Sequence, residues 1–209
     1  MITLYEYKSS RSIRCQWTLR ELGIDYKKVE VDVLHKPDWF LALNPMGKVP
    51  VLVDDDVTMI ESAAICMYLA DQYPDKGLAP LINTPARARY YQWISYAINE
   101  IDPLLWILRL HRDVLPEKDR VPGIIDITKR EVVKRLDFLQ QNLGDKAYFV
   151  GDKFTVVDIL MTQLISWASV YGLLEGYQPL VDYKDRHRSR PGFPAHLYQQ
   201  SKQSAAGKN

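Results

Sequence analysis

The sequence predicts a mixed α/β domain followed by an all-α domain, and three observations within its 209 residues lead to this prediction. Short strand-like and helix-like segments alternate as far as residue 74. Residues 75–85 carry prolines and a glycine, as is typical of a linker. The later segments have the apolar spacing of helices. We therefore expect two domains, at residues 1–76 and at residues 85–205.

The first half has the predicted element order β-α-β-α-β-β-α. Valines at alternate positions in residues 26–33 indicate a strand. Gly23 is suited to end the preceding helix, because glycine readily adopts the left-handed conformation. The acidic run Asp54-Asp55-Asp56 separates two short strands and indicates a hairpin. Strands are expected at residues 2–7, 26–33, 51–53 and 57–60, and helices at residues 13–22, 38–43 and 63–73.

The second half contains long helical segments. Residues 86–111 form the first, and Pro103 within it predicts a kink. Residues 126–143 have apolar positions at helical spacing with charges between them. A further helix begins with Thr155 and Asp158, the pair of a capping box, and is apolar on nearly every side. We therefore expect this helix to form the centre of the second domain.

Two dipeptides near the predicted hairpin indicate a ligand site. Pro50 stands at the first position of a strand, where no ladder hydrogen bond is required of it, and it favours an extended Val49. The backbone of Val49 could then pair with a peptide-like ligand, as a strand edge does. Glu61 and Ser62 lead into a helix whose first N–H groups attract an anionic group. Together these features predict a pocket for a small zwitterionic peptide.

This constellation resembles the glutathione site of the cytosolic glutathione transferase superfamily, and the resemblance extends along nearly the whole chain. It rests on an ordered set of dipeptides, Asn44-Pro45, Val49-Pro50 and Glu61-Ser62. The resemblance implies a thioredoxin-like fold for the first domain, with Pro50 cis and glutathione as the co-substrate. It also implies that Val49 pairs with the cysteinyl part of glutathione, and that Glu61 and Ser62 hold the γ-glutamyl end.

Glutathione must lose its thiol proton to attack an electrophile, and a cysteine-type thiol with a pKa of about 8.5 is mostly protonated at neutral pH. A hydrogen-bond donor, a helix N-terminus or a cation near the sulfur favours the thiolate. Ser9, Ser10, Arg11 and Ser12 lie between the first strand and the first helix, where such groups are needed. Ser10 and Ser12 could instead cap the helix, since serine is favoured at helix starts.

The stretch from Tyr5 to Tyr26 is similar to the zeta class of the superfamily, in which a Ser-Ser-Cys-x-x-Arg motif precedes a helix that ends in Gly-Ile-Asp-Tyr. Here the segment from Ser9 to Arg14 falls in register with the motif, and Gly23-Ile24-Asp25-Tyr26 fixes the alignment. The similarity implies that Ser9 donates to the thiolate and that Ser10 and Arg11 line the site. Arg11 replaces the zeta-class cysteine, so the isomerase chemistry of that class does not carry over. The sequence thus predicts a serine-type enzyme without assigning its class.

Other residues near the site leave alternatives open. Lys48 could bind the glycine carboxylate of glutathione, and so could Lys36 or His35. Cys15 lies about one turn into the first helix, where we expect a buried structural thiol. If Cys15 instead formed a mixed disulfide, the protein would be a glutathione-dependent thiol-disulfide reductase or peroxidase. A third alternative is a non-catalytic binding module with the same fold.

The bulk properties exclude other partners. A net charge of +1 gives no reason to expect nucleic acid or an anionic membrane, and the basic run at residues 184–190 is interpreted as a solvated surface. No apolar segment approaches the roughly 20 residues needed to cross a bilayer, and the first residues lack the pattern of a signal peptide. Two isolated cysteines predict neither a disulfide scaffold nor a metal site. We therefore expect a cytoplasmic protein.

The resemblance also implies a homodimer that acts in detoxification on a small hydrophobic electrophile. The electrophile is expected to meet the helical domain, chiefly the segment at residues 86–111. Aromatic residues of this segment, which could equally form domain or dimer core, are Tyr90, Tyr91, Trp93, Tyr96 and Trp106. The sequence does not identify the electrophile.

Overall fold

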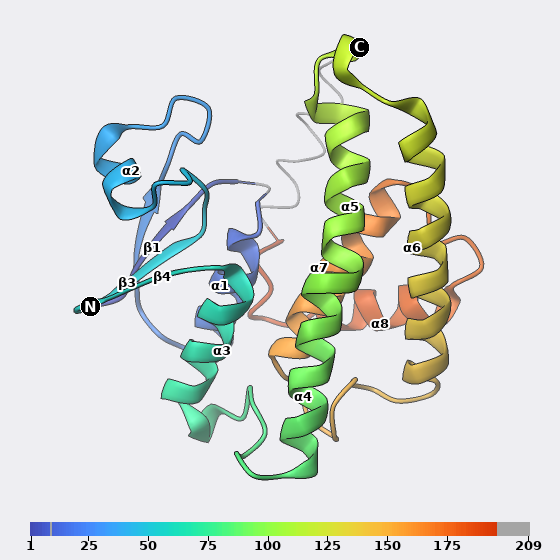
Figure 1. Cartoon of the computed structure of the whole chain (residues 1–209). Coiled ribbons are helices and arrows are strands. Elements are labelled where there is room, and N and C mark those ends of the chain that lie inside the picture. The colour runs from blue at the N-terminus through green and yellow to red at the C-terminus, as the bar shows by residue number, and fades with distance from the viewer. Residues whose placement is uncertain (9, 196–209) are drawn as a thin grey trace. The chain divides into compact units, whose positions relative to one another are not determined.

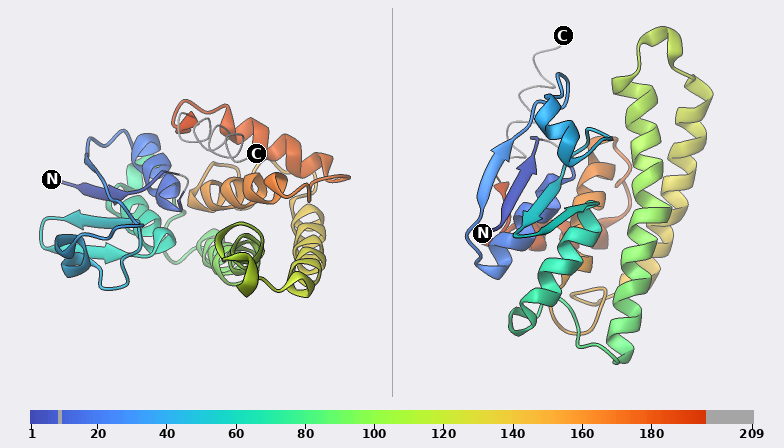
Figure 2. Two further views of the ribbon diagram at one scale, coloured as in Figure 1. Left: turned by 90° about the horizontal axis from the view of Figure 1, so that it is seen from above. Right: turned by 60° about the vertical axis from the view of Figure 1, so that its left-hand side comes forward.

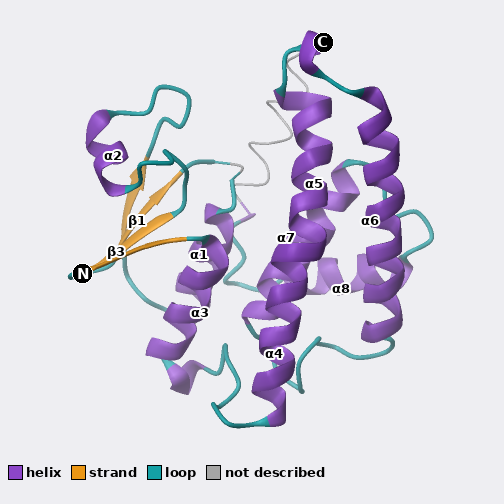
Figure 3. Cartoon of the chain, in the orientation of Figure 1, coloured by secondary structure: helices purple, strands orange, loops and turns teal. Residues whose placement is uncertain are grey.

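The computed structural model describes residues 1–8 and 10–195 of the chain (Figure 1). It divides into two compact units. The first comprises Met1–Ala79 together with the described residues from Arg190 to Ala195, and the second comprises Pro80–Ser189. The described strands belong to the first unit, and the described part of the second unit consists of helices and loops (Figure 3).

The first unit has the predicted order of strands and helices. Its elements are β1 Thr3–Glu6, α1 Ser12–Leu22, β2 Lys27–Glu30, α2 Asp38–Leu43, β3 Val51–Asp54, β4 Val57–Ile60 and α3 Ser62–Gln72, followed by the 3₁₀ turn η1 Pro74–Lys76. The strands form one sheet in the order β2-β1-β3-β4, with β1 and β2 parallel and the other pairs antiparallel. This is the thioredoxin-like arrangement that the resemblance implied.

The second strand is shorter than predicted, because it ends at Glu30 rather than at residue 33. The side chain of Asp32 accepts hydrogen bonds from the backbone N–H groups of Leu34, at 2.9 Å, and His35, at 3.2 Å. These bonds close a turn, which offers the backbone an alternative to the sheet ladder. The alternating valines predicted a longer strand because they do not reveal that the side chain of Asp32 competes with the sheet for the backbone N–H groups.

Both faces of the sheet are covered. Leu4 of β1 and its partner Leu52 of β3 are fully buried on the face that carries α1 and α3. Tyr5 lies on the opposite face and contacts Phe40 of α2, with ring centroids 6.2 Å apart. The sheet therefore lies between α1 and α3 on one side and α2 on the other (Figure 1).

Two backbone expectations are confirmed. The Val49–Pro50 peptide bond is cis. Gly23 follows α1 with a φ of 69°, and its N–H donates to carbonyl oxygens of the last turn. This left-handed conformation ends the helix at the predicted place because glycine has no Cβ to clash.

The second unit is a helical bundle with α7 at its centre (Figure 2). Its helices are α4 Pro85–Tyr96, α5 Asp102–Arg109, α6 Pro122–Leu143, α7 Val156–Val170 and α8 Gln178–Arg188, with the shorter helical segments η2 Ala97–Ile101, η3 Leu110–Val114 and η4 Glu117–Asp119. Helix α7 packs against α4, α5 and α8. None of the described helices is both long and apolar enough to cross a membrane.

The predicted interruption of the first long helix lies just before Pro103. Residues Ala97–Ile101 form a π-helical segment, and Pro103 stands in the first turn of α5. Because proline has no N–H, the regular hydrogen-bond ladder cannot continue through it, and a local change of helical pitch accommodates the gap. The regular α-helix is thus interrupted where the proline predicted it.

The capping box of α7 is confirmed. The backbone N–H of Thr155 donates to Asp158 Oδ2 at 2.8 Å. Asp158 Oδ1 accepts from the backbone N–H of Phe149 at 3.2 Å and from the hydroxyl of Tyr183 at 2.6 Å. Despite these bonds, burial raises the pKa of Asp158 to about 6. This carboxylate joins three segments of the helical unit.

The interpretation of residues 184–190 as a solvated surface is wrong in part. His187 is only 1% exposed, and its ring lies 4.1 Å from that of Tyr183 between centroids. Leu180, Tyr183 and His187 share the buried side of α8, because residues three and four apart lie on one helix face. The charges between them mark the outer side of the same helix.

Candidate functional site

Three connections of the α/β unit meet at one end of its sheet. Strand β3 pairs with β1 and β4 in antiparallel fashion, and Val51 stands opposite Ile60. The end of β1, the start of β3 and the end of β4 therefore lie side by side. The chain leaves this end toward α1, returns to it through the cis Val49–Pro50 bond, and leaves again through Glu61 into α3.

The loop before Val49 is held by Asn44, which is only 3% exposed. Its side-chain Nδ2 donates to the backbone carbonyl of Lys48 at 2.7 Å, and its Oδ1 accepts from the N–H of Met46 at 3.2 Å. Its own backbone carbonyl accepts from the N–H of Gly47 at 2.8 Å. These bonds fix the path of the loop into Val49.

Val49 has unused backbone hydrogen-bonding capacity. Its side chain is half-buried against the apolar cluster under α2, so the residue is held in place. Within the described residues, its N–H and C=O make no hydrogen bond. Unpaired backbone groups next to a strand can receive an extended peptide, and the geometry agrees with the predicted role of this residue.

Glu61 has an unusual backbone conformation, with φ of 70° and ψ of 107°. Only glycine adopts this region easily, and such strain amounts to about 1–3 kcal/mol in other residues. The side chain of Glu61 is exposed, and among the described residues no side-chain hydrogen bond caps the start of α3. An anionic group placed there would meet these N–H groups and the helix dipole.

Ser62 begins α3 and is held by a buried arginine. Arg14 is 1% exposed, and its Nη1 donates to Ser62 Oγ at 3.2 Å. Ser62 Oγ thus accepts a hydrogen bond from within the protein. A hydroxyl has one proton to donate, so Ser62 can still donate that proton to a ligand.

The start of α1 engages two of the three candidate serines. Ser10 Oγ donates to the backbone carbonyl of Tyr7 at 2.7 Å and accepts from the N–H of Ser12 at 3.1 Å. Ser12 is 1% exposed, and its Oγ lies 2.8 Å from Ser10 Oγ. Arg11 precedes the helix and is half-buried. Ser9, the predicted thiolate donor, lies outside the described residues.

The two cysteines have the buried positions expected of structural thiols. Cys15 and Cys66 are both fully buried. The thiol of Cys15 donates to the backbone carbonyl of Ser62 at 3.7 Å, within the limit for a sulfur donor. Burial raises the pKa of the Cys15 thiol well above its ordinary value. A thiol that stays protonated is a poor nucleophile.

The two candidate lysines lie in loops, Lys36 before α2 and Lys48 before β3. Lys48 is exposed. The side chain of Lys36 crosses Gly47, which is buried and has a φ of 61°. A Cβ at position 47 would overlap the aliphatic part of Lys36, so glycine meets both a backbone and a packing requirement there.

Sequence reasoning did not assign the roles of Arg14 and Asn44. In the sequence, Arg14 stands out only as the last residue of the serine-rich motif, and Asn44 only as part of the dipeptide Asn44-Pro45. A signal was present for each, because arginine is rarely buried without a partner and asparagine side chains bond to nearby backbone groups. The partners themselves, Ser62 and the carbonyl of Lys48, emerge only in the folded structure.

Comparisons with known proteins agree with this geometry. Residues 4–77 match the family model described as the glutathione S-transferase N-terminal domain. Residues 104–191 match the model of the glutathione S-transferase C-terminal domain. The chain is 32% identical over 186 residues to glutathione S-transferase GstA of Escherichia coli O157:H7, covering 86% of this chain and 89% of that protein. It is 31% identical to glutathione S-transferase 3 of Schizosaccharomyces pombe, over 76% of this chain and 70% of the relative.

Solved structures show the same similarity. A sphingomonad glutathione S-transferase complexed with glutathione has a TM-score of 0.83 at 28% identity, covering 95% of this chain and 98% of the other. A glutathione transferase from Methylococcus capsulatus has a TM-score of 0.85 at 26% identity, covering 96% and 99% of the two chains. By its sequence and its fold, the chain belongs to the glutathione S-transferase family.

Proposed function

We propose that this glutathione transferase adds the thiolate of glutathione to small, hydrophobic electrophiles, with Ser9 donating a hydrogen bond to the sulfur. The observation that carries the proposal is the meeting of three connections at one end of the sheet. There, the backbone of Val49 lies beside the start of α3, and no described residue pairs with the former or caps the latter. A zwitterionic peptide needs a backbone partner for its amide groups and N–H donors for its carboxylate.

Glutathione is assigned to these groups according to its chemistry. The backbone of Val49, fixed by Pro50, pairs with the cysteinyl amide and carbonyl. Glu61 accepts from the γ-glutamyl ammonium, while Ser62 and the N–H groups of α3 hold its carboxylate. Lys48 binds the glycine carboxylate. The exposed side chain of Lys48 and the exposed carboxylate of Glu61 support these two ionic contacts.

The start of α1 supports Ser9 as the thiolate donor. Ser10 donates its single proton to the carbonyl of Tyr7, and Ser12 is buried beside it. Ser9 is the third serine of this segment, and the similarity to the zeta class implies the donor role for it. Ser10 and Arg11 lie next to the N-terminus of the same helix. The partial positive charge of the α1 N-terminus and the guanidinium of Arg11 would further favour the thiolate.

The substitution Ser9→Ala tests this assignment. Turnover with a chloronitrobenzene acceptor should fall about 10–1000-fold, the usual effect of removing one catalytic donor. Glutathione affinity, measured by calorimetry, should stay nearly unchanged. Ser10→Ala is the matched control and should keep most of the turnover. A normal rate in Ser9→Ala combined with a loss in Ser10→Ala would transfer the role to Ser10.

The rival chemistries predict different results for Cys15→Ser. A reductase that formed a mixed disulfide at Cys15 would lose its turnover with a disulfide substrate in this variant. The buried, protonated thiol supports the opposite outcome, namely conjugation that is indifferent to the substitution. A non-catalytic module would give no conjugation in the wild-type protein. Failure to bind millimolar glutathione would reject the ligand assignment itself.

We also propose that the chain forms a homodimer in the cytoplasm and acts in detoxification. Tyr91 and Ile98, seven positions apart along α4 and η2, are 46% and 37% exposed, which supports an apolar contact surface. Two free cysteines fit a reducing compartment. Sedimentation should give twice the chain mass of 24.2 kDa at micromolar concentration. A monomer under those conditions would reject the dimer.

A further inference from the structure

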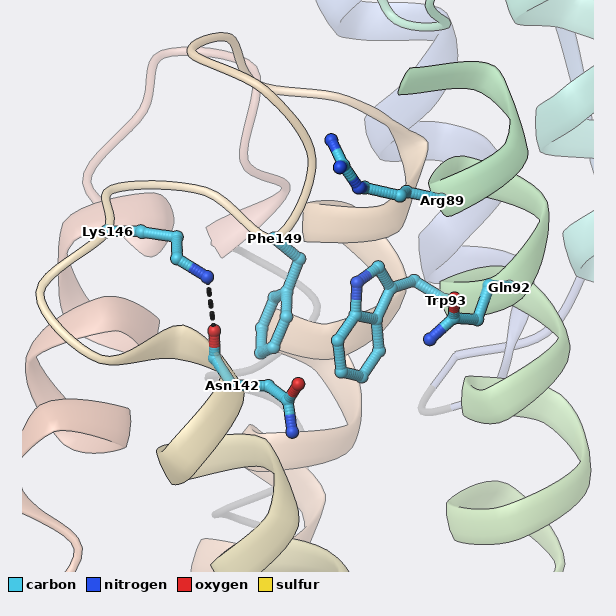
Figure 4. A pocket seen from close by; sticks show the side chains of 6 residues that line it. All are labelled: Arg89, Gln92, Trp93, Asn142, Lys146 and Phe149. Carbon is cyan, nitrogen blue, oxygen red and sulfur yellow. Dashed lines mark hydrogen bonds between the residues drawn. The ribbon is translucent and has the colours of Figure 1, made fainter. Parts of the chain in front are cut away.

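A pocket of about 180 Å³ lies within the helical unit. It is formed by α4, the end of α6 and the loop that follows α6. Its lining residues are Arg89, Gln92, Trp93, Asn142, Lys146 and Phe149 (Figure 4). None of these residues belongs to the proposed glutathione site. Two of them are cationic and none is acidic, so the lining carries a net positive charge.

The two cations of the pocket differ from others nearby. Arg89 is exposed, and its side chain makes no ion pair or hydrogen bond with the described residues. Lys146 Nζ donates to the backbone carbonyl of Asn142 at 2.7 Å, which leaves two of its three N–H donors available. By contrast, Arg135 on α6 pairs with the carboxylates of Glu131 and Glu100. The charge of the pocket is thus not neutralised by its lining.

The floor of the pocket is aromatic. The rings of Trp93 and Phe149 lie 4.9 Å apart between centroids at an angle of 56°, and both residues are 6% exposed. In Figure 4, the side chain of Lys146 lies beside the ring of Phe149, and that of Arg89 lies above the ring of Trp93. Gln92 adds an amide that can both donate and accept. A ligand that joined the two cations would therefore pass over the ring edges.

We propose that this pocket binds a small, flat molecule carrying two carboxylates, one at Arg89 and the other at Lys146. Each carboxylate forms charge-assisted hydrogen bonds, which are stronger than bonds between neutral groups, and the planar guanidinium of Arg89 matches a carboxylate in two-point fashion. The flat middle of the ligand covers the edges of Trp93 and Phe149. Binding there is independent of glutathione chemistry.

Calorimetric titration of the full chain with isophthalate, a flat dicarboxylate, tests the proposal at fixed ionic strength. We expect saturable binding of one molecule per chain. Arg89→Gln and Lys146→Gln should each weaken it by about 3–10-fold, since each removes one charge-assisted contact. Arg130→Gln and Lys118→Gln remove the same charges from exposed positions outside the pocket and should leave the affinity unchanged. Benzoate, with one carboxylate, should bind at least about threefold more weakly.

The location is tested by the NMR signal of the Trp93 indole N–H, identified by its loss in Trp93→Phe. Isophthalate should shift this signal in the wild-type protein and much less in Arg89→Gln. Absence of saturable binding would overturn the proposal. So would equal weakening by the control substitutions, or equal affinity for benzoate. Lys146 also contacts the end of α6, so the melting temperature of Lys146→Gln is measured as a control for folding. If Lys146→Gln unfolds, the result for Arg89→Gln decides the proposal.

Discussion

In the α/β unit, polar groups around Val49 and Ser62 keep hydrogen-bonding capacity unused, whereas in the helical unit the buried carboxylate of Asp158 is engaged on both oxygens. The first arrangement is suited to a ligand, because a free donor or acceptor gains a partner when the ligand binds. The second is suited to folding, since each bond joins one segment of the unit to another. The unused bonds at Val49 and Ser62 therefore favour a binding role for these residues, and the engaged oxygens of Asp158 favour a structural role.

Removal of the structural carboxylate should have the largest effect on stability. Asp158→Ala leaves the N–H groups of Phe149 and Thr155 and the hydroxyl of Tyr183 without their acceptor in a buried place. The free energy of unfolding should fall by about 3–4 kcal/mol in denaturant titrations. Asp152→Ala, at an exposed position, is the control. Equal stability of the two variants would show that the contacts of Asp158 are not structural.

The pH dependence of Asp158 should be the next largest effect. Its pKa is raised from 3.8 to about 6, so ionisation is less favourable in the folded state than in the unfolded state. Its contribution to stability is then greatest below pH 3.8 and is lost as pH rises through about 6. The stability of the wild type relative to Asp158→Asn should decline by about 3 kcal/mol across this window. A difference that grew with pH would contradict the sign.

Arg14 tests whether the hydroxyl of Ser62 must be positioned. Loss of its bond to Ser62 in Arg14→Gln should raise the KM for glutathione about tenfold while kcat at saturating glutathione stays similar. Arg20→Gln, an exposed substitution on the same helix, is the control. A fall in melting temperature with an unchanged KM would give Arg14 a purely structural role.

The backbone of Glu61 should give the smallest change in stability. Glu61→Gly relieves the conformation at φ of 70°, which should stabilise the fold by about 1 kcal/mol in thermal unfolding, yet weaken glutathione binding. Asp55→Gly relieves a φ of 51° in the hairpin turn and should not affect glutathione binding. If Glu61→Gly bound glutathione normally, the carboxylate would have no role in the site.

Local signals were enough to predict the element order, the hairpin, Gly23 and the capping box. Each depends on residues close together in the chain, where periodicity and turn chemistry act directly. The two dipeptides of the site were also local signals, whereas the cis Val49–Pro50 bond and the assignment of glutathione came from the family resemblance. The structure confirms the cis bond and places Val49 and Glu61 at one end of the sheet.

Long-range contacts could not be predicted in the same way. Arg190 follows the helical unit in sequence, yet its guanidinium donates to both carboxylate oxygens of Glu21 on α1, at 2.9 Å and 2.8 Å. Trp17 of α1 also lies 5.0 Å from Phe193 between ring centroids. Nothing in the composition of residues 184–190 reveals these partners, because a charge run has no periodicity of its own.

The central claim, that Ser9 stabilises the thiolate of glutathione, is tested most directly by the pKa of the bound thiol. Ultraviolet difference titration of the glutathione complex should give a value well below about 8.5 in the wild-type protein. In Ser9→Ala this pKa should return toward the free value, while in Ser10→Ala it should stay low. A low pKa that survives in Ser9→Ala would contradict the account and leave the α1 N-terminus or Arg11 as the stabilising group.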